Sequence, residues 1–338
     1  PLSGQCDTKC IAPSGFDEGR TYVYSYNTET DSSIQQEEYG SSKLTVNCEA
    51  RLEVLGTCEI VLELRDVSVQ ETDGNGDTIT SPNEESFREH LTRNRLRFGM
   101  QRGTVTSVCP SPDEAVWVTN FKRGVLSALQ LTLPSIRSES ETIIESTVSG
   151  KCPTNVFSEE EGMVTKHKDF TKCEGRYNMD AIIPGIQLVP YAPSTNAITS
   201  EQQCRQEHNG DYVTFSECRE RHILFPIADP PTGPISTVSQ RLTFDRIIKA
   251  PSNHIVERIE DRKSILYEHH IHMEEGKTDS TRANQLVSDL CESLTNGVDT
   301  GTAKLYNSVI HEMRRLEANT LAGVLASATC EGYQSSLE

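Results

Sequence analysis

The 338-residue sequence lacks several features, and each absence excludes a class of protein. No apolar run reaches the roughly 18 residues that a membrane-spanning helix needs, so we expect a protein that is not transmembrane. Basic residues are few, with 32 Lys plus Arg against 50 Asp plus Glu. The resulting formal charge of -18 argues against nucleic acid as a partner, because phosphate contacts need a basic face.

Motifs of catalysis are also missing. The sequence contains no G-x-S-x-G, HExxH, GxGxxG or Walker pattern and no CxxC pair. We therefore expect no enzymatic activity and no cofactor.

Cysteine is abundant, with 11 residues, and this number predicts disulfides and a secreted protein. The first residues, PLSGQC, have no signal-peptide pattern, so we expect any signal peptide to have been removed already. Local pairing favours Cys152 with Cys173 and Cys204 with Cys218, each worth about 3 kcal/mol from loop entropy. A second group would tie the N-terminus to the first hairpin: Cys6, Cys10, Cys48 and Cys58. Three cysteines then remain, one of them unpaired: Cys109, Cys291 and Cys330.

Strand patterns dominate up to about residue 275. Apolar residues alternate over 20–26, 43–54 and 58–69, and further strand-like stretches follow at 240–248 and 264–273. Two polar stretches, 27–42 and 70–86, read as long loops.

One helix is expected inside this β region, at 117–131. Acidic residues precede it, Pro134 stops it, and an apolar stripe that begins at Trp117 recurs at three- and four-residue spacing. The stripe must pack on a sheet. Either an antiparallel sheet curls around the helix, or the helix lies on an open sheet, and periodicity does not separate the two.

Helical patterns replace strand patterns after residue 276. Amphipathic stretches joined by short loops predict the first helices of an α-hairpin solenoid that ends before it is complete. We therefore predict an α+β protein with a β domain at 1–276 and the start of a helical domain at 277–338.

Two motifs suggest metal sites. His270 and His272 share a strand face with Glu268 and Glu274, which could hold zinc, but a solvated strand face is favoured because histidines are often exposed. A second motif has the spacing of a calcium loop at positions 1, 3, 5 and 12 but lacks its glycine, so an ordinary acidic loop is favoured: Asp73, Asn75, Asp77 and Glu84.

Two basic stretches stand out on the acidic background. The first is expected to point outward from a strand and consists of Arg88, Arg93, Arg95, Arg97 and Arg102. The second consists of Lys166, Lys168, Lys172 and Arg176, with His167 among them. Either stretch could dock an acidic partner, and the alternative for both is a solvated charged face.

Four segments resemble the N-terminal module of the large lipid transfer proteins. The most specific is WVTNFKRGVLSALQ at 117–130, and it is followed in order by ESTVSGKCPTNVF, KHKDFTKCEGRY and the pair Cys204 and Cys218. This family comprises vitellogenins, apolipophorins, apolipoprotein B and microsomal triglyceride transfer protein, with arthropod clottable and glucan-binding lipoproteins as relatives.

The resemblance implies a β-barrel that encloses the 117–131 helix, followed by an α-solenoid. It also implies that lipid is carried by the larger protein and that the partners are the rest of the same polypeptide and a low-density-lipoprotein-receptor-type receptor. Lys166, Lys168, Lys172 and Arg176 match the segment linked to receptor contact. We expect an extracellular location in haemolymph, plasma or oocyte yolk, and a homodimer is compatible. The alternative function is a haemolymph clotting protein cross-linked by transglutaminase, or a glucan pattern-recognition protein.

Overall fold

A computed structural model gives the structure of the protein. It describes Cys6, 10–34, 41–134, 140–160, 162–174, 198–224, 234–251, 262–268, 280–295, 300–313, Leu316 and 318–327. Two compact units result, a sheet unit that contains all described strands and a helical unit formed by α3–α5.

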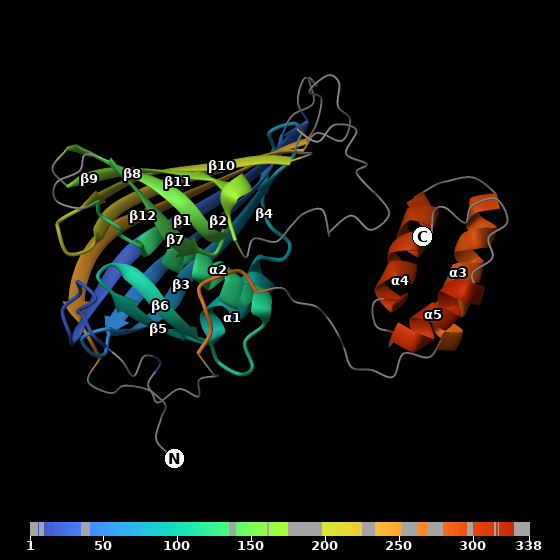
Figure 1. Ribbon diagram of the computed structural model, residues 1–338, viewed down its shortest axis with the longest axis horizontal. Helices are drawn as coiled ribbons and strands as arrows, with labels where there is room; N and C mark the ends of the chain where they lie inside the picture. The colour runs from blue at the N-terminus through green and yellow to red at the C-terminus, as the bar shows by residue number, and fades with distance from the viewer. Residues whose placement is uncertain are drawn as a thin grey trace, which may run out of the picture. The chain divides into compact units, whose positions relative to one another are not determined.

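A 12-stranded sheet forms the first unit, and all its described strand pairs are antiparallel (Figure 1). The strands are β1 (Arg20–Ile34), β2 (Ser42–Val54), β3 (Glu59–Thr72), β4 (Thr78–Thr80), β5 (Leu96–Gln101), β6 (Thr104–Cys109), β7 (Ser140–Thr147), β8 (Gly150–Glu160), β9 (Met163–Asp169), β10 (Ile198–His208), β11 (Val213–Leu224) and β12 (Pro234–Lys249). Their order is β6-β5-β3-β2-β1-β12-β11-β10-β9-β8-β7, and β4 pairs with β3. The sheet thus has two halves, which meet where β1 pairs with β12.

Alternation along the strands builds the core. Tyr22, Tyr24 and Tyr26 point to one face of β1, and Leu52 and Leu62 are among the residues that join them in the largest apolar cluster. Because successive side chains of a strand point to opposite faces, this inner face is apolar while the outer face stays polar. The alternation of 20–26, 43–54 and 58–69 therefore marks real strands, as expected.

Two helices lie against the inner face. Helix α2 (Val116–Leu129) contacts β6, β7, β11 and β12, so strands from both halves of the sheet touch it. Helix α1 (Glu84–Arg93) packs on β3 and was not expected, because its Arg-rich sequence resembles a solvated strand. Trp117 also differs from the expectation: it is 38 % exposed and packs against Phe87 and His90 of α1.

Residues 262–268, which we call the strap, run past α2 from one end of the sheet to the other. Lys263 exchanges two backbone hydrogen bonds with Val108 of β6, and the Tyr267 N–H donates to the carbonyl of Val148, just after β7. Ile265 is buried in the main core. The strap thus joins the two ends of the sheet across α2, where a strand at 264–273 was expected.

A closed barrel is not confirmed. Strands β6 and β7 end the sheet, and no strand pairing joins them within the part of the chain that the structure describes. The described connection between these two ends is the strap rather than a ladder of hydrogen bonds.

The predicted loops are shorter than expected. Strand β1 continues to Ile34 and β2 begins at Ser42, so most of 27–42 belongs to strands. The stretch 70–86 forms a tight turn between β3 and β4 and then enters α1. The Asp73 carboxylate accepts hydrogen bonds from the backbone of Asn75 and Asp77 inside this turn.

These contacts are those of an ordinary acidic turn, the interpretation that the sequence favoured over a calcium loop. Glu84 accepts a hydrogen bond from the Val69 N–H, away from the Asp73 turn. No group of three or more metal-ligating side chains occurs among the described residues.

Gly103 holds the β5–β6 turn against the end of α2. Its φ is +74°, and a Cβ at this position would lie 2.3 Å from the Leu131 carbonyl oxygen. We expect Gly103→Ala to lower the free energy of unfolding by more than about 1 kcal/mol, through backbone strain and steric overlap. Gly76, at φ +89° with open space around it, is the matched control. Denaturant unfolding checks this, and equal losses in the two variants would contradict the steric part.

The helical unit contains α3 (Ser280–Thr295), α4 (Thr300–Met313) and α5 (Ala318–Ser327). Its core comes from the predicted stripes and includes Val287, Leu290, Val309 and Met313. No helix in the described part of the chain is long and apolar enough to cross a membrane. The predicted boundary at residue 276 lies outside the described residues.

Candidate functional site

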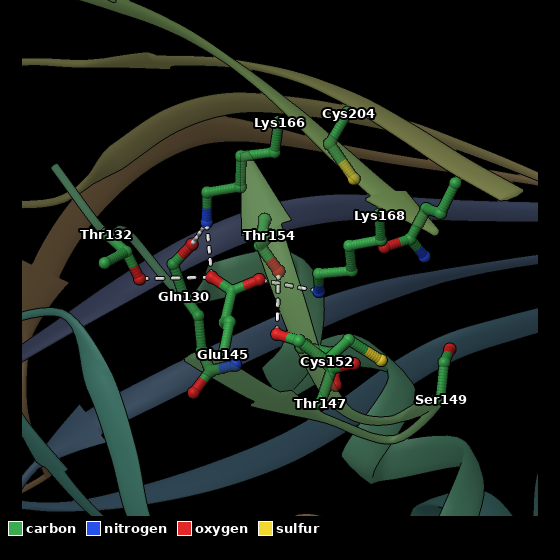
Figure 2. Close-up of polar contacts among 12 residues, drawn as sticks. Gln130, Thr132, Glu145, Thr147, Ser149, Cys152, Thr154, Lys166, Lys168 and Cys204 are labelled. Atoms are coloured by element: carbon green, nitrogen blue, oxygen red, sulfur yellow. Dashed lines mark hydrogen bonds and ion pairs between the residues drawn. The ribbon is translucent and has the colours of Figure 1, made fainter. Parts of the chain in front are cut away.

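A buried charge cluster lies between the sheet and the C-terminal end of α2. The Glu145 carboxylate, on β7, is 2.7 Å from the Lys166 Nζ and 2.6 Å from the Lys168 Nζ, both on β9 (Figure 2). All three residues point inward because they occupy the same face of the sheet two strands apart. Lys166 is 3 % exposed and Lys168 is 5 % exposed. Two of the four predicted receptor-binding residues therefore do not lie on the surface.

Electrostatics hold the cluster in its charged form. Burial by itself would raise the pKa of Glu145, but the two neighbouring ammonium groups outweigh burial and lower this pKa to about 2. Burial lowers the pKa of Lys166 below its usual 10.5, and Glu145 partly opposes that shift. A third contact comes from Thr132, whose hydroxyl donates to the Glu145 carboxylate at 3.1 Å.

The end of α2 compensates for the extra positive charge. Lys166 donates to the Gln130 carbonyl at 3.0 Å, and the Gln206 amide donates to the carbonyls of Ala128 and Gln130. Helix C-termini carry unpaired carbonyls and about half a negative charge, so a buried ammonium is favourable there. The cluster thus anchors α2 to β7, β9 and β10.

The size of the adjoining cavity limits what the cluster can do. That cavity has a volume of about 20 Å³, which is enough for about one water molecule and too small for a lipid or an organic substrate. The geometry therefore fits a positioning role rather than catalysis.

The charged residues in the middle of α2 are also buried. Lys122 is fully buried and pairs with Glu114, and its Nζ donates to the Asn94 carbonyl. Arg123 is 1 % exposed and pairs at 3.0 Å with Glu268 of the strap.

Asn120 forms hydrogen bonds with the backbone of the same strap residue, Glu268. Its side-chain amide donates to the Glu268 carbonyl at 2.7 Å, and its oxygen accepts from the Glu268 N–H at 3.0 Å. The three polar residues of the N-F-K-R part of the motif, Asn120, Lys122 and Arg123, are thus explained by partners on the strap and around α2. An apolar stripe alone does not predict these partners.

The first basic stretch, Arg88 to Arg102, is not a continuous outward face, which corrects the prediction. Arg88 and Arg93 lie on α1, where they pair with Glu84 and Asp113. The strand-side members have partners too: Arg95 pairs with Glu53, and Arg97 is buried and pairs with Glu59. Arg102 is exposed in the β5–β6 turn. Helix α1 and the disulfide-bonded N-terminal segment therefore divide the patch.

Of the remaining predicted receptor and metal residues, only Lys172 lies in the described part of the chain. Lys172 is exposed and pairs with Asp169 at 3.4 Å. Arg176, His270 and His272 lie outside the described residues.

The disulfides agree with the sequence in part. Cys152–Cys173 and Cys204–Cys218 are present as expected, and the second joins residues directly opposite each other on β10 and β11. Cys10–Cys58 ties the N-terminal segment to the first hairpin, while Cys6 pairs with Cys109. Cys291 is also disulfide-bonded.

Cys48 was expected in a disulfide, and this was wrong. It is a buried free thiol on the inner face of β2, where its register partner is Tyr26. Burial raises its pKa to about 12.

Such a thiol is expected to resist alkylation, since the thiolate is the reactive species. Iodoacetamide at pH 8 should leave Cys48 unmodified in the native protein and modify it fully in denaturant. Peptide mass spectrometry measures this, and rapid native labelling of Cys48 would contradict the buried position.

Comparison with known proteins agrees with this fold. The sequence matches the Vitellogenin N-terminal domain family over residues 16–252. Vitellogenin of Penaeus merguiensis is 24 % identical over 328 residues, which is 92 % of this chain and 12 % of that protein. Apolipoprotein B-100 of Rattus norvegicus is 25 % identical over 245 residues, covering 68 % of this chain and 5 % of that protein. The chain therefore spans a small part of the relatives that it matches.

A solved structure, of lipid–protein interactions in lipovitellin, has the same fold. It superposes with a TM-score of 0.68 at 17 % identity, covering 94 % of this chain and 35 % of that one. The chain thus has a fold of the lipovitellin type. The chain belongs to the Vitellogenin N-terminal domain family.

Proposed function

We propose that this chain is the N-terminal part of a secreted lipid-transport apolipoprotein and that it organises the N-terminal end of the lipid-carrying particle. The observation that carries this proposal is the family match over 16–252 together with the lipovitellin-like fold. The disulfides support an extracellular location, because they persist in oxidising compartments. The role is non-enzymatic and needs no cofactor.

Within this proposal, the sheet and the strap form a barrel-like enclosure for α2, and α3–α5 begin a solenoid. Ion pairs and hydrogen bonds around α2 support the enclosure. Both charged residues of the helix, Lys122 and Arg123, form ion pairs with residues outside it, and the Lys166 ammonium donates to the carbonyl at its C-terminal end. We propose that the lipid itself is held by the rest of the polypeptide. The cavity beside α2 does not hold it, since that cavity admits only about one water molecule.

Expression of the full-length protein in secretory cells tests the lipid-transport role. We expect it to be recovered from the medium and to float with lipid in a density gradient, whereas a variant without 16–252 is retained in the cell. Secretion of an equally lipid-loaded particle without 16–252 would refute the organising role.

We further propose a receptor-binding role for this module, with Lys172 as the described residue available for it. Lys172 is exposed, whereas Lys166 and Lys168 are committed to Glu145. Charge reversal at Lys172 is expected to weaken binding to low-density-lipoprotein-receptor-type repeats about three-fold at low salt. Surface plasmon resonance with calcium measures this, with Lys151→Glu as the control for another exposed, ion-paired lysine. Equal binding by the Lys172 variant and the unaltered protein would remove this residue from the contact.

A further inference from the structure

The outer face of the sheet carries a groove that neither the fold nor the lipid-transport role uses. On this face, opposite α2, two hollows of about 460 Å³ and 580 Å³ lie over neighbouring strands. Both are lined by Glu201 and Gln203 of β10 and by Arg221 of β11. Because they share these residues, we treat them as one depression across β8–β12, β1 and the start of β2, and β10, β11 and β12 lie side by side in Figure 1.

Strand β11 supplies the centre of the groove. Its buried residues Ser216 and Cys218 point inward, so Arg219, Arg221 and Ile223 line the outer face at every second position. Residues i and i+2 of a strand are about 6.6 Å apart. The groove thus presents two guanidinium groups and one apolar side chain at regular spacing along the strand.

These two arginines differ from the other arginines of the outer face. Arg205 pairs with Glu207, Arg241 pairs with Glu217, and Arg246 pairs with Asp245 and Glu49. Within the described residues, neither Arg219 nor Arg221 forms an ion pair.

The acidic side chains of the groove are partly neutralised within the chain. Lys43 pairs with Glu29 at 3.3 Å and with Asp31 at 3.4 Å, and Asp169 pairs with Lys172. Glu201 stands opposite Arg221 in the strand register without an ion pair to it in the described structure. Lys43 has one charge for two carboxylates, so the charges around the groove balance. The affinity for an anion that we argue below therefore comes locally from Arg219 and Arg221, which have no ion pair within the described residues, and not from a net positive charge.

Hydrogen-bonding side chains flank the arginines. Thr237 and Ser239 of β12 lie on one side of β11, and Gln203 of β10 lies on the other. They suit the backbone of an extended segment. Guanidinium groups bind carboxylates through two parallel hydrogen bonds, and alternate side chains of an extended peptide have the same spacing as those of β11.

We propose that this groove binds an extended acidic segment of a partner protein, with two carboxylates on Arg219 and Arg221 and an aliphatic side chain beside Ile223. The segment has acidic, acidic and aliphatic residues at alternate positions. Arg219 and Arg221 lie on the face of the sheet opposite to the Glu145 cluster, although Lys168 of that cluster also lines the 460 Å³ hollow. The proposal does not depend on lipid transport.

Fluorescence anisotropy of labelled peptides on the full chain tests it. The probes are Asp-Ser-Asp-Ser-Leu and its reverse, and the control peptide has Asn in place of both Asp. We expect salt-sensitive binding of one Asp peptide that weakens about three-fold in Arg219→Gln or Arg221→Gln and about ten-fold in the double variant. Glu201→Gln should tighten binding, because it removes the competing carboxylate. Arg241→Gln, which alters an arginine already paired with Glu217, is the matched control.

Two further measurements test whether the groove binds other anions instead of a peptide. Inorganic phosphate is titrated by isothermal calorimetry, and phosphatidylserine vesicles are tested by co-sedimentation. Equal affinity for the Asn peptide, no effect of the arginine variants, or arginine-dependent binding of phosphate or vesicles without peptide binding would overturn the proposal. Circular dichroism and thermal unfolding confirm that each variant is folded.

Discussion

Glu145→Gln is expected to lower the free energy of unfolding by about 3–5 kcal/mol, the usual cost of removing one partner from a buried ion pair. The substitution keeps the shape of the side chain but leaves two buried ammonium groups with no counter-charge. Denaturant unfolding measures the effect. Glu174→Gln is the matched control, because its pair with Lys151 is exposed and such pairs contribute about 0–1 kcal/mol.

A triple variant distinguishes lost charge balance from lost packing. Replacing Glu145, Lys166 and Lys168 together with Leu, Met and Met removes all three charges, so it should be less destabilising than Glu145→Gln alone. If the triple variant were the less stable of the two, the charge cluster would be valuable in itself and the stated reason would be wrong.

Glu145 is also expected to make the free energy of unfolding depend on pH in the acid range. The folded-state pKa of Glu145, about 2, lies below its ordinary value of 4.5, so the unfolded state binds a proton first as the pH falls. The contribution of Glu145 is therefore complete above pH 4.5 and is lost between about pH 4.5 and 2. Glu145→Gln should flatten this part of the curve, and an unchanged acid limb would contradict the low pKa.

Removal of the Cys6–Cys109 disulfide by Cys6→Ala and Cys109→Ala is expected to cost about 2–5 kcal/mol. This bond joins residues 103 positions apart and closes the longest loop among the described disulfides, and loop entropy grows with loop length. It also holds the N-terminal segment over β5 and β6, next to the buried pair of Arg97 and Glu59.

Cys204→Ala with Cys218→Ala is the comparison for this experiment. That bond spans 14 positions between strands that already pair along their length, so its loss is expected to be smaller, about 3 kcal/mol or less. Guanidinium unfolding of both variants gives the order. A larger loss from the Cys204–Cys218 variant would show that local strand geometry outweighs loop entropy here.

Local patterns in the sequence were sufficient for much of the fold. Alternating apolar residues marked the strands around Tyr22–Tyr26 and Leu52, and three- and four-residue spacing marked 117–131 and the later helices. These patterns suffice because a strand or helix that buries one face must repeat apolar residues at its own period. Helix α1 was not predicted, because it buries a single residue, Leu91, and so has no repeating apolar pattern.

The candidate sites were harder to predict from sequence. A run of lysines reads as a solvated basic face, but Lys166 and Lys168 become buried because α2 covers their side of β9 and Glu145 lies within reach on β7. The partners are about 20 residues apart in sequence and two strands apart in the sheet, so no local pattern connects them. Cys48 was misassigned for a related reason: its register partner is Tyr26, which only the pairing of β1 and β2 reveals.

By itself, the sequence determined the family, the antiparallel strands, the α2 helix and the local disulfides, because each depends on residue order over short distances. Among the described residues, the tertiary structure alone decided which charges are buried, which arginines lack ion pairs and which cysteine is free. Those properties depend on the registers of strands far apart in the chain and on the placement of α2 and the strap, which set the solvation and the neighbours of each polar group.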